Sequence, residues 1–269
     1  MTSPTKPNPV IFIHGLWIHS SAWQPWLDLF ENYGYAVSAP GWPGELATVA
    51  QTRETPDGMN DVGIQQMVDH YAELIRARGG VKPLVVGHSF GGLIAQELLA
   101  EGLIAAAVAI DPAPIRGVKA LPVAQLRSAF PVLGNPANRH RTVALTAKQF
   151  HYAFGNALSE EESNALHEAW SIPAVGKPLF EDAGANFSRH SAAKVDTHVA
   201  HRGPLLLTSG TEDHVVPLKV AKEVVAMYSK SPAETDFHVF EGRGHSLTID
   251  NGWKEVAGVV LDWLAAKGF

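Results

Sequence analysis

Short runs of apolar residues, most of them bounded by glycine or proline, recur along the chain and leave room for a helix between them. They occupy residues 10–13, 36–39, 84–86, 105–110, 205–208 and 237–240. Most are continuously apolar rather than alternating, which is typical of strands that are covered on both faces. These runs therefore predict the strands of a parallel sheet.

Segments with the apolar spacing of helices lie between the predicted strands. Apolar residues at positions 23, 26, 27 and 30 predict the first helix, with Ser20 or Ser21 as its N-cap. A second pattern begins at position 64 and ends at Gly79. Two more helices are predicted over residues 217–228 and 253–267. This alternation of strands and helices predicts a doubly wound, mostly parallel α/β sheet.

One interval breaks the alternation. Between the fourth and fifth predicted strands lie roughly 90 residues, far more than one crossover connection needs. This interval has helix start signals of its own, because Thr146 and Ser159 each begin a capping-box pattern. We therefore predict a helical cap over residues 113–202, inserted into a core that is formed by residues 1–112 and 203–269.

Composition and charge narrow the class of protein. A chain of 269 residues suffices for one large domain, or for one domain with an insertion. With 46% hydrophobic and 18% charged residues, a disordered or coiled-coil chain is excluded. The net charge of −6 argues against binding to nucleic acid. Because the chain has no cysteine, disulfides, thiolate metal sites and a cysteine nucleophile are excluded as well.

The sequence shows no signal for export or for membrane insertion. Its N-terminal region has three prolines among residues 1–9 and lacks the apolar core of a signal peptide. No apolar run approaches the ~20 residues that a membrane-spanning helix needs. We therefore expect a cytoplasmic protein that does not enter a membrane.

A Gly-x-Ser-x-Gly pattern lies between a predicted strand and a helix-like segment, with Ser89 between Gly87 and Gly91. This pattern is known as the nucleophile elbow. A strand-to-helix turn this sharp holds the serine in a strained backbone conformation, and the flanking glycines let strand and helix approach without Cβ clashes. The following helix directs its N-terminal N–H groups toward the serine oxygen. Ser89 is therefore the candidate nucleophile.

Landmarks along nearly the whole chain resemble those of the α/β-hydrolase family. A strand ends in His14-Gly15, and Ser89 follows in its elbow. Asp213 then follows a late strand in a Gly-x-x-Asp-x-x-Val-Pro pattern, and His245 follows the last strand in Gly-Arg-Gly-His. The chain order Ser, Asp, His is the order of this fold. Because the His-Gly strand begins near residue 10, the resemblance implies a sheet that lacks the first two strands of the family.

The chemical roles of these residues follow from acid–base chemistry. A free serine hydroxyl is a poor nucleophile, so His245 is the candidate base that takes its proton. Asp213 would accept the other ring N–H, fix the tautomer and stabilise the imidazolium. The negative oxygen that forms on the substrate needs preorganised donors. We assign these to the backbone N–H groups of Leu16 and Phe90, with Trp17 as the alternative to Leu16.

Other residues compete for these roles. Asp111 also ends a strand, and some relatives in the family place the acid there, but we favour Asp213 because its loop leads into the next helix. Asp250 lies too close in sequence to the candidate histidine and is predicted to be a turn residue. His198 and His201 have the spacing of a metal pair, but a third ligand at suitable spacing is missing. We therefore expect neither a metal nor another cofactor.

Together these observations predict a cofactor-independent serine hydrolase that cleaves a carboxylic ester or a lactone through a Ser89 acyl-enzyme. The predicted cap favours a closed pocket and a small or medium hydrophobic ester or lactone as the partner. C–C bond hydrolases, cofactor-free haloperoxidases and a slow-turnover ligand receptor stay open as alternatives. A hydroxynitrile lyase is disfavoured because Ser246, rather than a lysine, follows His245. The sequence leaves the oligomeric state open.

Overall fold

The computed structural model describes residues 8–269, and its centre is a six-stranded parallel sheet. The strands lie in the order β2-β1-β3-β4-β7-β8, so β2 and β8 form the two edges. Their bounds are β1 (Val10–Ile13), β2 (Val37–Ser38), β3 (Leu84–His88), β4 (Ala106–Ile110), β7 (Leu205–Gly210) and β8 (Thr235–Phe240). A separate antiparallel pair is formed by β5 (Thr142–Val143) and β6 (Ala174–Val175).

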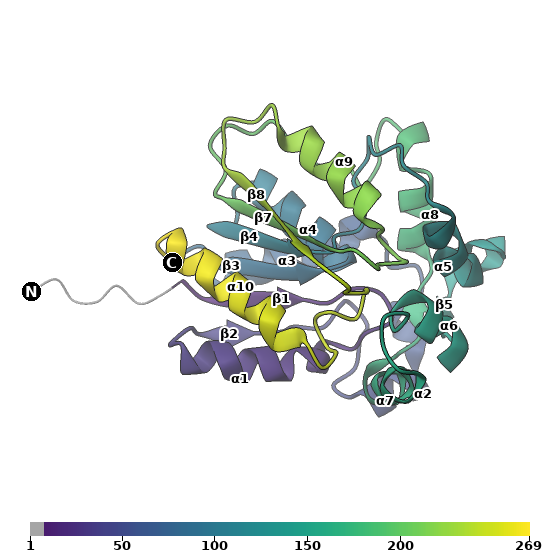
Figure 1. Ribbon diagram of the computed structural model, residues 1–269. Coiled ribbons are helices and arrows are strands. Elements are labelled where there is room, and N and C mark those ends of the chain that lie inside the picture. The colour runs from purple at the N-terminus through teal and green to yellow at the C-terminus, as the bar shows by residue number, and fades with distance from the viewer. Residues whose placement is uncertain (1–7) are drawn as a thin grey trace, which may run out of the picture.

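Helices cover both faces of this sheet (Figure 1). One face is covered by α1 (Gln24–Asn32) and α10 (Trp253–Ala266), and the other by α3 (Ile64–Arg78), α4 (Phe90–Ala100) and α9 (Leu218–Tyr228). A shorter helix, α2 (Val49–Glu54), follows β2. The predicted doubly wound α/β fold is confirmed, and within residues 8–269 the sheet begins at β2, beside the His-Gly strand.

The chain between β4 and β7, residues 111–204, forms a group of helices at one end of the sheet, on the right in Figure 1. We call it the β4–β7 segment. Its helices are α5 (Val123–Leu133), α6 (Ala147–Ala153), α7 (Glu160–Trp170) and α8 (Lys177–Ala183). Its helical content agrees with the prediction from the sequence, while its division from the core at residues 113 and 202 stays a prediction.

Burial explains why the strand sequences are continuously apolar. Every residue of β1, β3, β4 and β7 is buried, whereas the edge strand β8 is mostly half-buried. On one face, Phe12 packs against the rings of Trp23 and Phe30, with centroids 5.1 Å away in both cases. On the other face, residues 90–99 of α4 are all buried. The two cores fix the carboxyl ends of the strands, where the candidate site residues follow.

The N-termini of two helices, α1 and α7, differ in detail from the predictions. Residues 20–23 form a 3₁₀ turn that is capped by His19, so α1 begins one turn later than predicted. The capping box predicted at α6 is confirmed. At α7 only half of the predicted box forms: the Ser159 hydroxyl accepts the Glu162 N–H, but the Glu162 carboxylate accepts hydrogen bonds from Asn251 instead. Tertiary contacts thus redirect side chains that the local pattern assigns to the helix end.

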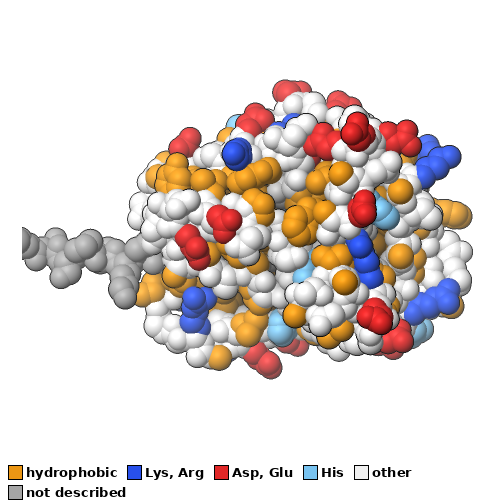
Figure 2. Space-filling view, turned by 90° about the horizontal axis from the view of Figure 1, so that it is seen from below, with side chains coloured by type: hydrophobic (Ala, Val, Ile, Leu, Met, Phe, Trp, Pro, Cys, Tyr) orange, Lys and Arg blue, Asp and Glu red, His pale blue; other side chains and the backbone are white. Residues whose placement is uncertain are grey.

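The surface carries charges of both signs. On the face shown in Figure 2, acidic and basic side chains are interspersed with apolar patches. Large apolar side chains are exposed around α5, where Leu121, Val123 and Phe130 are 66%, 80% and 69% exposed. Within residues 8–269, the structure contains no helix with both the length and the apolar character that crossing a bilayer requires.

Candidate active site

Ser89 lies at the turn between β3 and α4 in a conformation that residues with a side chain rarely adopt. Its φ and ψ angles are 55° and −120°, and a positive φ is strained for a residue with a Cβ. The turn requires glycine on both sides. A Cβ on Gly87 would lie 2.1 Å from the Gly91 carbonyl oxygen, and one on Gly91 would lie 2.1 Å from the Ile13 carbonyl oxygen. The turn therefore has the sharp geometry of a nucleophile elbow.

His245 and Asp213 meet through a short hydrogen bond in the interior. His245 Nδ1 donates to Asp213 Oδ2 at 2.6 Å, and both side chains are completely buried. The other carboxylate oxygen accepts the backbone N–H groups of Val215 and Val216 at 2.7 and 2.8 Å. Burial alone would raise the pKa of Asp213, but the His245 charge and the hydrogen bonds hold it below its usual range. Asp213 is thus an ionised acceptor that keeps the His245 proton on Nδ1.

Asp111, the rival candidate for the acid, lies next to Asp213 in the same site. Its carboxyl group accepts the Gly210 N–H at 3.1 Å and the Thr208 hydroxyl at 3.3 Å, and it is hydrogen-bonded to Asp213. Burial, followed by the negative charge of Asp213, raises the pKa of Asp111 well above its usual range. Asp111 is therefore protonated and donates to Asp213. The two aspartates share one negative charge, and Asp213 is the one that orients the imidazole.

Two residues support the imidazole of His245. His88, which precedes Ser89, donates Nε2–H to the His245 carbonyl oxygen at 3.0 Å, and the two rings lie 4.6 Å apart. Phe154, from the β4–β7 segment, packs edge-on against the His245 ring at 5.0 Å. Burial lowers the pKa of His88 well below its usual range, so this ring is neutral. His245 Nε2 is buried without a hydrogen-bond partner among residues 8–269, and it is available to take a proton.

The two predicted oxyanion donors follow two neighbouring strands, β1 and β3. Leu16 lies in the loop after β1, and Phe90 is the first residue of α4. Within the described part of the chain, neither backbone N–H donates to a protein group. The β1 loop runs directly against the nucleophile, because a Cβ on Gly15 would lie 2.6 Å from the Ser89 Cβ. Both N–H groups are therefore available to a ligand at Ser89.

Trp17, the alternative donor, ties the β1 loop to the β4–β7 segment. Its φ of 66° marks a second strained position. Its carbonyl oxygen accepts the Ile172 N–H at 2.9 Å, and its indole N–H donates to the Val143 carbonyl oxygen at 3.0 Å. The loop that carries Leu16 is consequently held in place by two hydrogen bonds to the β4–β7 segment.

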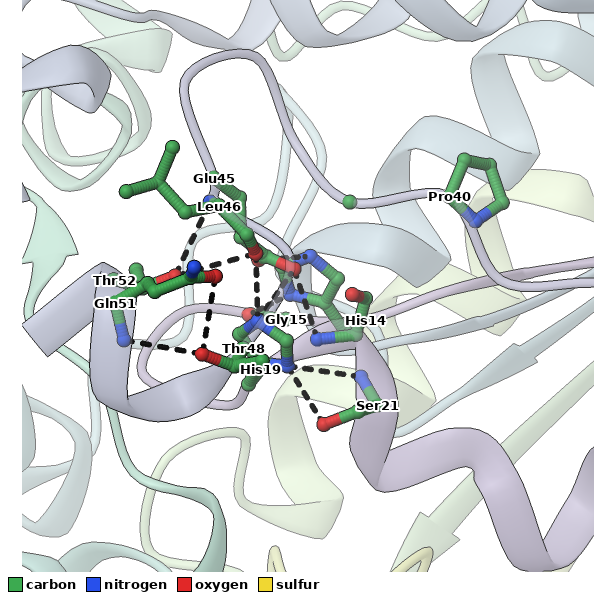
Figure 3. A network of polar contacts seen from close by, with 12 residues as sticks. His14, Gly15, His19, Ser21, Pro40, Glu45, Leu46, Thr48, Gln51 and Thr52 are labelled. Atoms are coloured by element: carbon green, nitrogen blue, oxygen red, sulfur yellow. Dashed lines mark hydrogen bonds and ion pairs between the residues drawn. The ribbon is translucent and has the colours of Figure 1, made fainter.

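A buried polar network lies beside the β1 loop (Figure 3). At its centre, Glu45 Oε2 lies 2.9 Å from His14 Nε2, and Glu45 Oε1 lies 3.5 Å from His19 Nε2. The three side chains are at most 3% exposed. The His14 contact is an ion pair whose angles depart from hydrogen-bond geometry. Ser20 N–H also donates to Glu45 Oε1 at 3.1 Å.

The two imidazoles make different contacts with the backbone. His14 Nδ1 donates to the Gly15 carbonyl oxygen at 2.9 Å, while its Nε2 faces Glu45. His19 Nδ1 accepts the Ser21 N–H at 3.1 Å. Burial alone would raise the pKa of Glu45, but the His14 charge and hydrogen bonding lower it to about 2. Because the peptide is planar and trans, holding the Gly15 carbonyl directs the Leu16 N–H to the opposite side.

A cavity of about 160 Å³ opens beside Ser89. Most of its walls are apolar and most come from the β4–β7 segment. It is lined by Trp17, Ser89, Phe90, Ala113, Pro114, Leu121, Gln125, Leu126, Ser128, Ala129, Leu133, Leu179, Asp182, Ala183, Val215 and Val216. An apolar cavity that adjoins an activated hydroxyl is typical of a small-molecule site.

The remaining candidates lie outside this arrangement or support it. Asp250 lies in the turn before α10, where it accepts the Ser246 hydroxyl at 3.1 Å and forms an ion pair with Arg243. These contacts stabilise the loop that carries His245. The turn role predicted for Asp250 therefore agrees with its position.

One group of side chains among residues 8–269 has the spacing of metal ligands, namely Asp111, Asp213 and His245. Their own hydrogen bonds account for this proximity, and a cation there would compete with the proton on His245 Nδ1. His198 and His201 do not belong to this group.

The comparison with known families identifies the chain. The model of the alpha/beta hydrolase family matches residues 10–259. This chain belongs to the α/β-hydrolase family. No curated protein sequence matches this α/β-hydrolase.

Solved structures agree with this assignment at the level of the fold. An extracellular α/β-hydrolase from a Paenibacillus species is 22% identical, with a TM-score of 0.67, over 95% of this chain and 98% of the other. A monoacylglycerol lipase from Paleococcus ferrophilus is 21% identical, with a TM-score of 0.68, over 97% and 96%. A thermophilic esterase from Thermogutta terrifontis is 15% identical, with a TM-score of 0.67, over 98% and 92%. Identities this low establish the shared fold alone.

Sequence reasoning missed three residues of this α/β-hydrolase site. Glu45 reaches the site from a connecting segment that carries no recognisable motif, and Phe154 reaches it from the end of α6, where the pattern does not distinguish it from a packing residue. Asp182 lines the cavity from α8, in an acidic stretch that resembles any exposed helix face in the sequence. One signal in the sequence pointed to a residue such as Glu45. His14 lies beside the predicted oxyanion loop, and a histidine that is buried needs a polar or charged partner.

Proposed function

We propose that this α/β-hydrolase is a cofactor-independent serine hydrolase that cleaves a carboxylic ester or a lactone through an acyl-enzyme on Ser89. The observation that carries the proposal is the buried hydrogen bond between His245 Nδ1 and Asp213 Oδ2. The serine of the strained elbow follows His88, which contacts His245. A base whose second nitrogen is fixed by an ionised carboxylate and a serine in a strained elbow are the groups that acyl transfer needs.

In the first half-reaction, His245 Nε2 takes the proton of Ser89 Oγ as this oxygen attacks the carbonyl carbon. Asp213 stabilises the resulting imidazolium. The N–H groups of Leu16 and Phe90 bind the oxyanion, and each such donor is typically worth ~3–4 kcal/mol to the transition state. The imidazolium then protonates the leaving alkoxide oxygen, the C–O bond breaks, and the acyl group stays on Ser89.

In the second half-reaction, water replaces the alcohol. His245 takes a proton from this water while the oxygen attacks the acyl carbon, and the same two N–H groups bind the second oxyanion. The proton returns to Ser89 Oγ as the acid is released. For a lactone the alcohol remains attached to the acyl group, so the product is a single hydroxy acid.

The cavity supports a substrate with an apolar chain. Its apolar walls, which the β4–β7 segment largely supplies, favour a small or medium hydrophobic acyl or alcohol group. Two structures that share the fold are described as a monoacylglycerol lipase and an esterase, and by analogy these names favour ester chemistry.

A fluorophosphonate probe should label the folded protein at Ser89, and a panel of p-nitrophenyl esters, aryl esters and lactones should identify turnover. The probe reacts with a serine only when a base and oxyanion donors activate it, so heat-denatured protein is the control. Peptide mapping by mass spectrometry locates the label, and initial rates measure the turnover. A folded protein that remains unlabelled would rule out the serine-hydrolase function.

Replacing Glu45 with glutamine should lower kcat about 10–100-fold and leave KM nearly unchanged. Without the carboxylate, the His14 ring loses the contact that fixes its orientation, and the Gly15 carbonyl that it holds becomes free to turn. The Leu16 N–H would then be misaligned for an oxyanion that exists in the transition state alone. Steady-state kinetics measure this effect on the best ester of the panel.

Two further measurements separate alignment from a general loss of structure in Glu45→Gln. Glu31→Gln on the exposed face of α1 is the matched control and should behave as the parent does. A boronic acid that mimics the tetrahedral intermediate should bind less tightly to Glu45→Gln, whereas the alcohol product should bind equally well. If kcat and boronate affinity both remain at the parent values, Glu45 has no part in oxyanion binding.

A further inference from the structure

The cavity at Ser89 is lined by three polar side chains that the proposed reaction does not use, namely Gln125, Ser128 and Asp182. The Ser128 hydroxyl already donates to the His214 carbonyl oxygen at 3.0 Å. Gln125 on α5 and Asp182 on α8 remain. Gln125 Oε1 is buried without a hydrogen-bond partner among residues 8–269. Two polar groups of the β4–β7 segment thus face an otherwise apolar space.

These two side chains mark the boundary of the cavity. Gln125 and Asp182, together with Pro114, Leu121 and Ala183, line both this cavity and a second hollow of about 250 Å³. They therefore stand in the wall that the two spaces share. A chain that enters from Ser89 and extends toward this wall would bring its atoms to the two side chains.

The Asp182 carboxyl group is poorly solvated. Burial raises its pKa to about 8, and neither a hydrogen bond nor a neighbouring charge offsets this effect. The group is therefore largely protonated at neutral pH and can both donate and accept a hydrogen bond. Gln125 Oε1, by contrast, needs a donor. Unpaired polar groups of this kind are costly in an apolar environment, and a ligand that pairs with them removes the cost.

We propose that the substrate chain in this cavity carries a hydroxyl group that hydrogen-bonds to Asp182 and Gln125. The inference rests on the proposed function, because it concerns the specificity of the same site. A hydroxyl group donates one hydrogen bond and accepts others, which matches a wall that offers both a protonated carboxyl and an amide oxygen. An ammonium group fits less well, because the cavity would have to hold two charges between apolar walls that carry no other ionisable side chain.

Matched ester pairs test this proposal. In each pair a six-carbon acyl chain, or a six-carbon alcohol chain, is compared with the same chain carrying a hydroxyl group at one of several successive positions. The parent should prefer one hydroxylated ester by about 5–100-fold in kcat/KM, since the unsubstituted chain leaves buried polar groups unpaired. Asp182→Leu should abolish this preference and raise kcat/KM for the unsubstituted ester, whereas Asp182→Asn should keep part of it.

A second variant and a matched control separate specificity from folding. Gln125→Leu, made alone, should weaken the preference as well. Asp262→Leu makes the same change on the exposed face of α10 and should keep the parent preference. A damaged fold would lower turnover of both esters of a pair, and it would not raise turnover of the unsubstituted one.

Binding to Ser89→Ala distinguishes failure of this proposal from failure of the proposed reaction. Calorimetry on this variant measures the affinity for the same pairs without turnover. The proposal is overturned if no hydroxylated chain binds more tightly, if the advantage persists in the Asp182→Leu background, or if a matched amino ester is preferred. If hydroxylated chains bind more tightly but the protein hydrolyses no ester, the proposed reaction is wrong and the proposed preference for a hydroxyl group stands.

Discussion

Ser89→Ala should remove nearly all ester turnover, with kcat lower by about four to six orders of magnitude. Without Oγ no acyl-enzyme forms, and the oxyanion donors and the cavity alone supply the residual rate. Stability should change little, because alanine has the same backbone strain at a φ of 55° and loses no hydrogen bond that anchors the elbow. Steady-state and single-turnover rates, together with thermal unfolding, measure both effects.

Ser229→Ala provides the matched control for this loss, since it removes a hydroxyl group from the exposed end of α9. It should retain the parent rate. Ester turnover that survives in Ser89→Ala at more than a hundredth of the parent rate would mean that another group attacks the substrate. The acyl-enzyme mechanism would then be wrong, whatever the geometry at His245.

The second large effect should separate the two aspartates. Asp213→Asn is expected to lower kcat by about 10⁴-fold, because the amide donates to His245 Nδ1 and moves the ring proton to Nε2, where the base is needed. Asp111→Asn should stay within about tenfold of the parent, because its amide N–H can still donate to the Asp213 carboxylate. Rates with the same ester measure both variants.

The pH dependence of folding gives an independent check on this pair. The pKa of Asp213 is lowered in the folded protein, so Asp213 stabilises the fold above its unfolded pKa and this contribution is lost as pH falls. Asp111 has a raised pKa, so its ionisation in the unfolded chain favours unfolding as pH rises. Asp111→Asn should therefore reduce the loss of stability toward higher pH. In the rate measurements, an inactive Asp111→Asn variant together with an active Asp213→Asn variant would mean that Asp111 orients His245.

The sequence predicted those parts of the molecule that depend on local patterns. Continuous apolar runs predicted the buried strands, because a strand covered on both faces needs apolar residues at every position. Ser89 was identifiable because the elbow needs glycine at fixed neighbouring positions, and both the strained serine and the tight glycines are present. The edge strand β2 is shorter than predicted, since residues at an edge gain less from pairing.

The sequence could not predict which partners meet through tertiary packing. Asp111 and Asp213 both follow strands, and although the loop pattern favoured Asp213, it could not show that Asp111 lies beside it and shares its charge. Glu45 becomes a partner of His14 because the connection after β2 passes beside the β1 loop. The pairing of Glu162 with Asn251 likewise depends on how α7 approaches the start of α10.

The edge-on contact of Phe154 with His245 has a consequence for engineering. The same residue accepts the Ser246 N–H through its carbonyl oxygen, and Ile172 donates to Trp17 beside the β1 loop. The helices that shape the substrate cavity therefore also brace the groups that perform the chemistry. A chimaera that borrows these helices from another hydrolase would inherit a new specificity together with a displaced base, unless the donor supplies equivalents of both contacts.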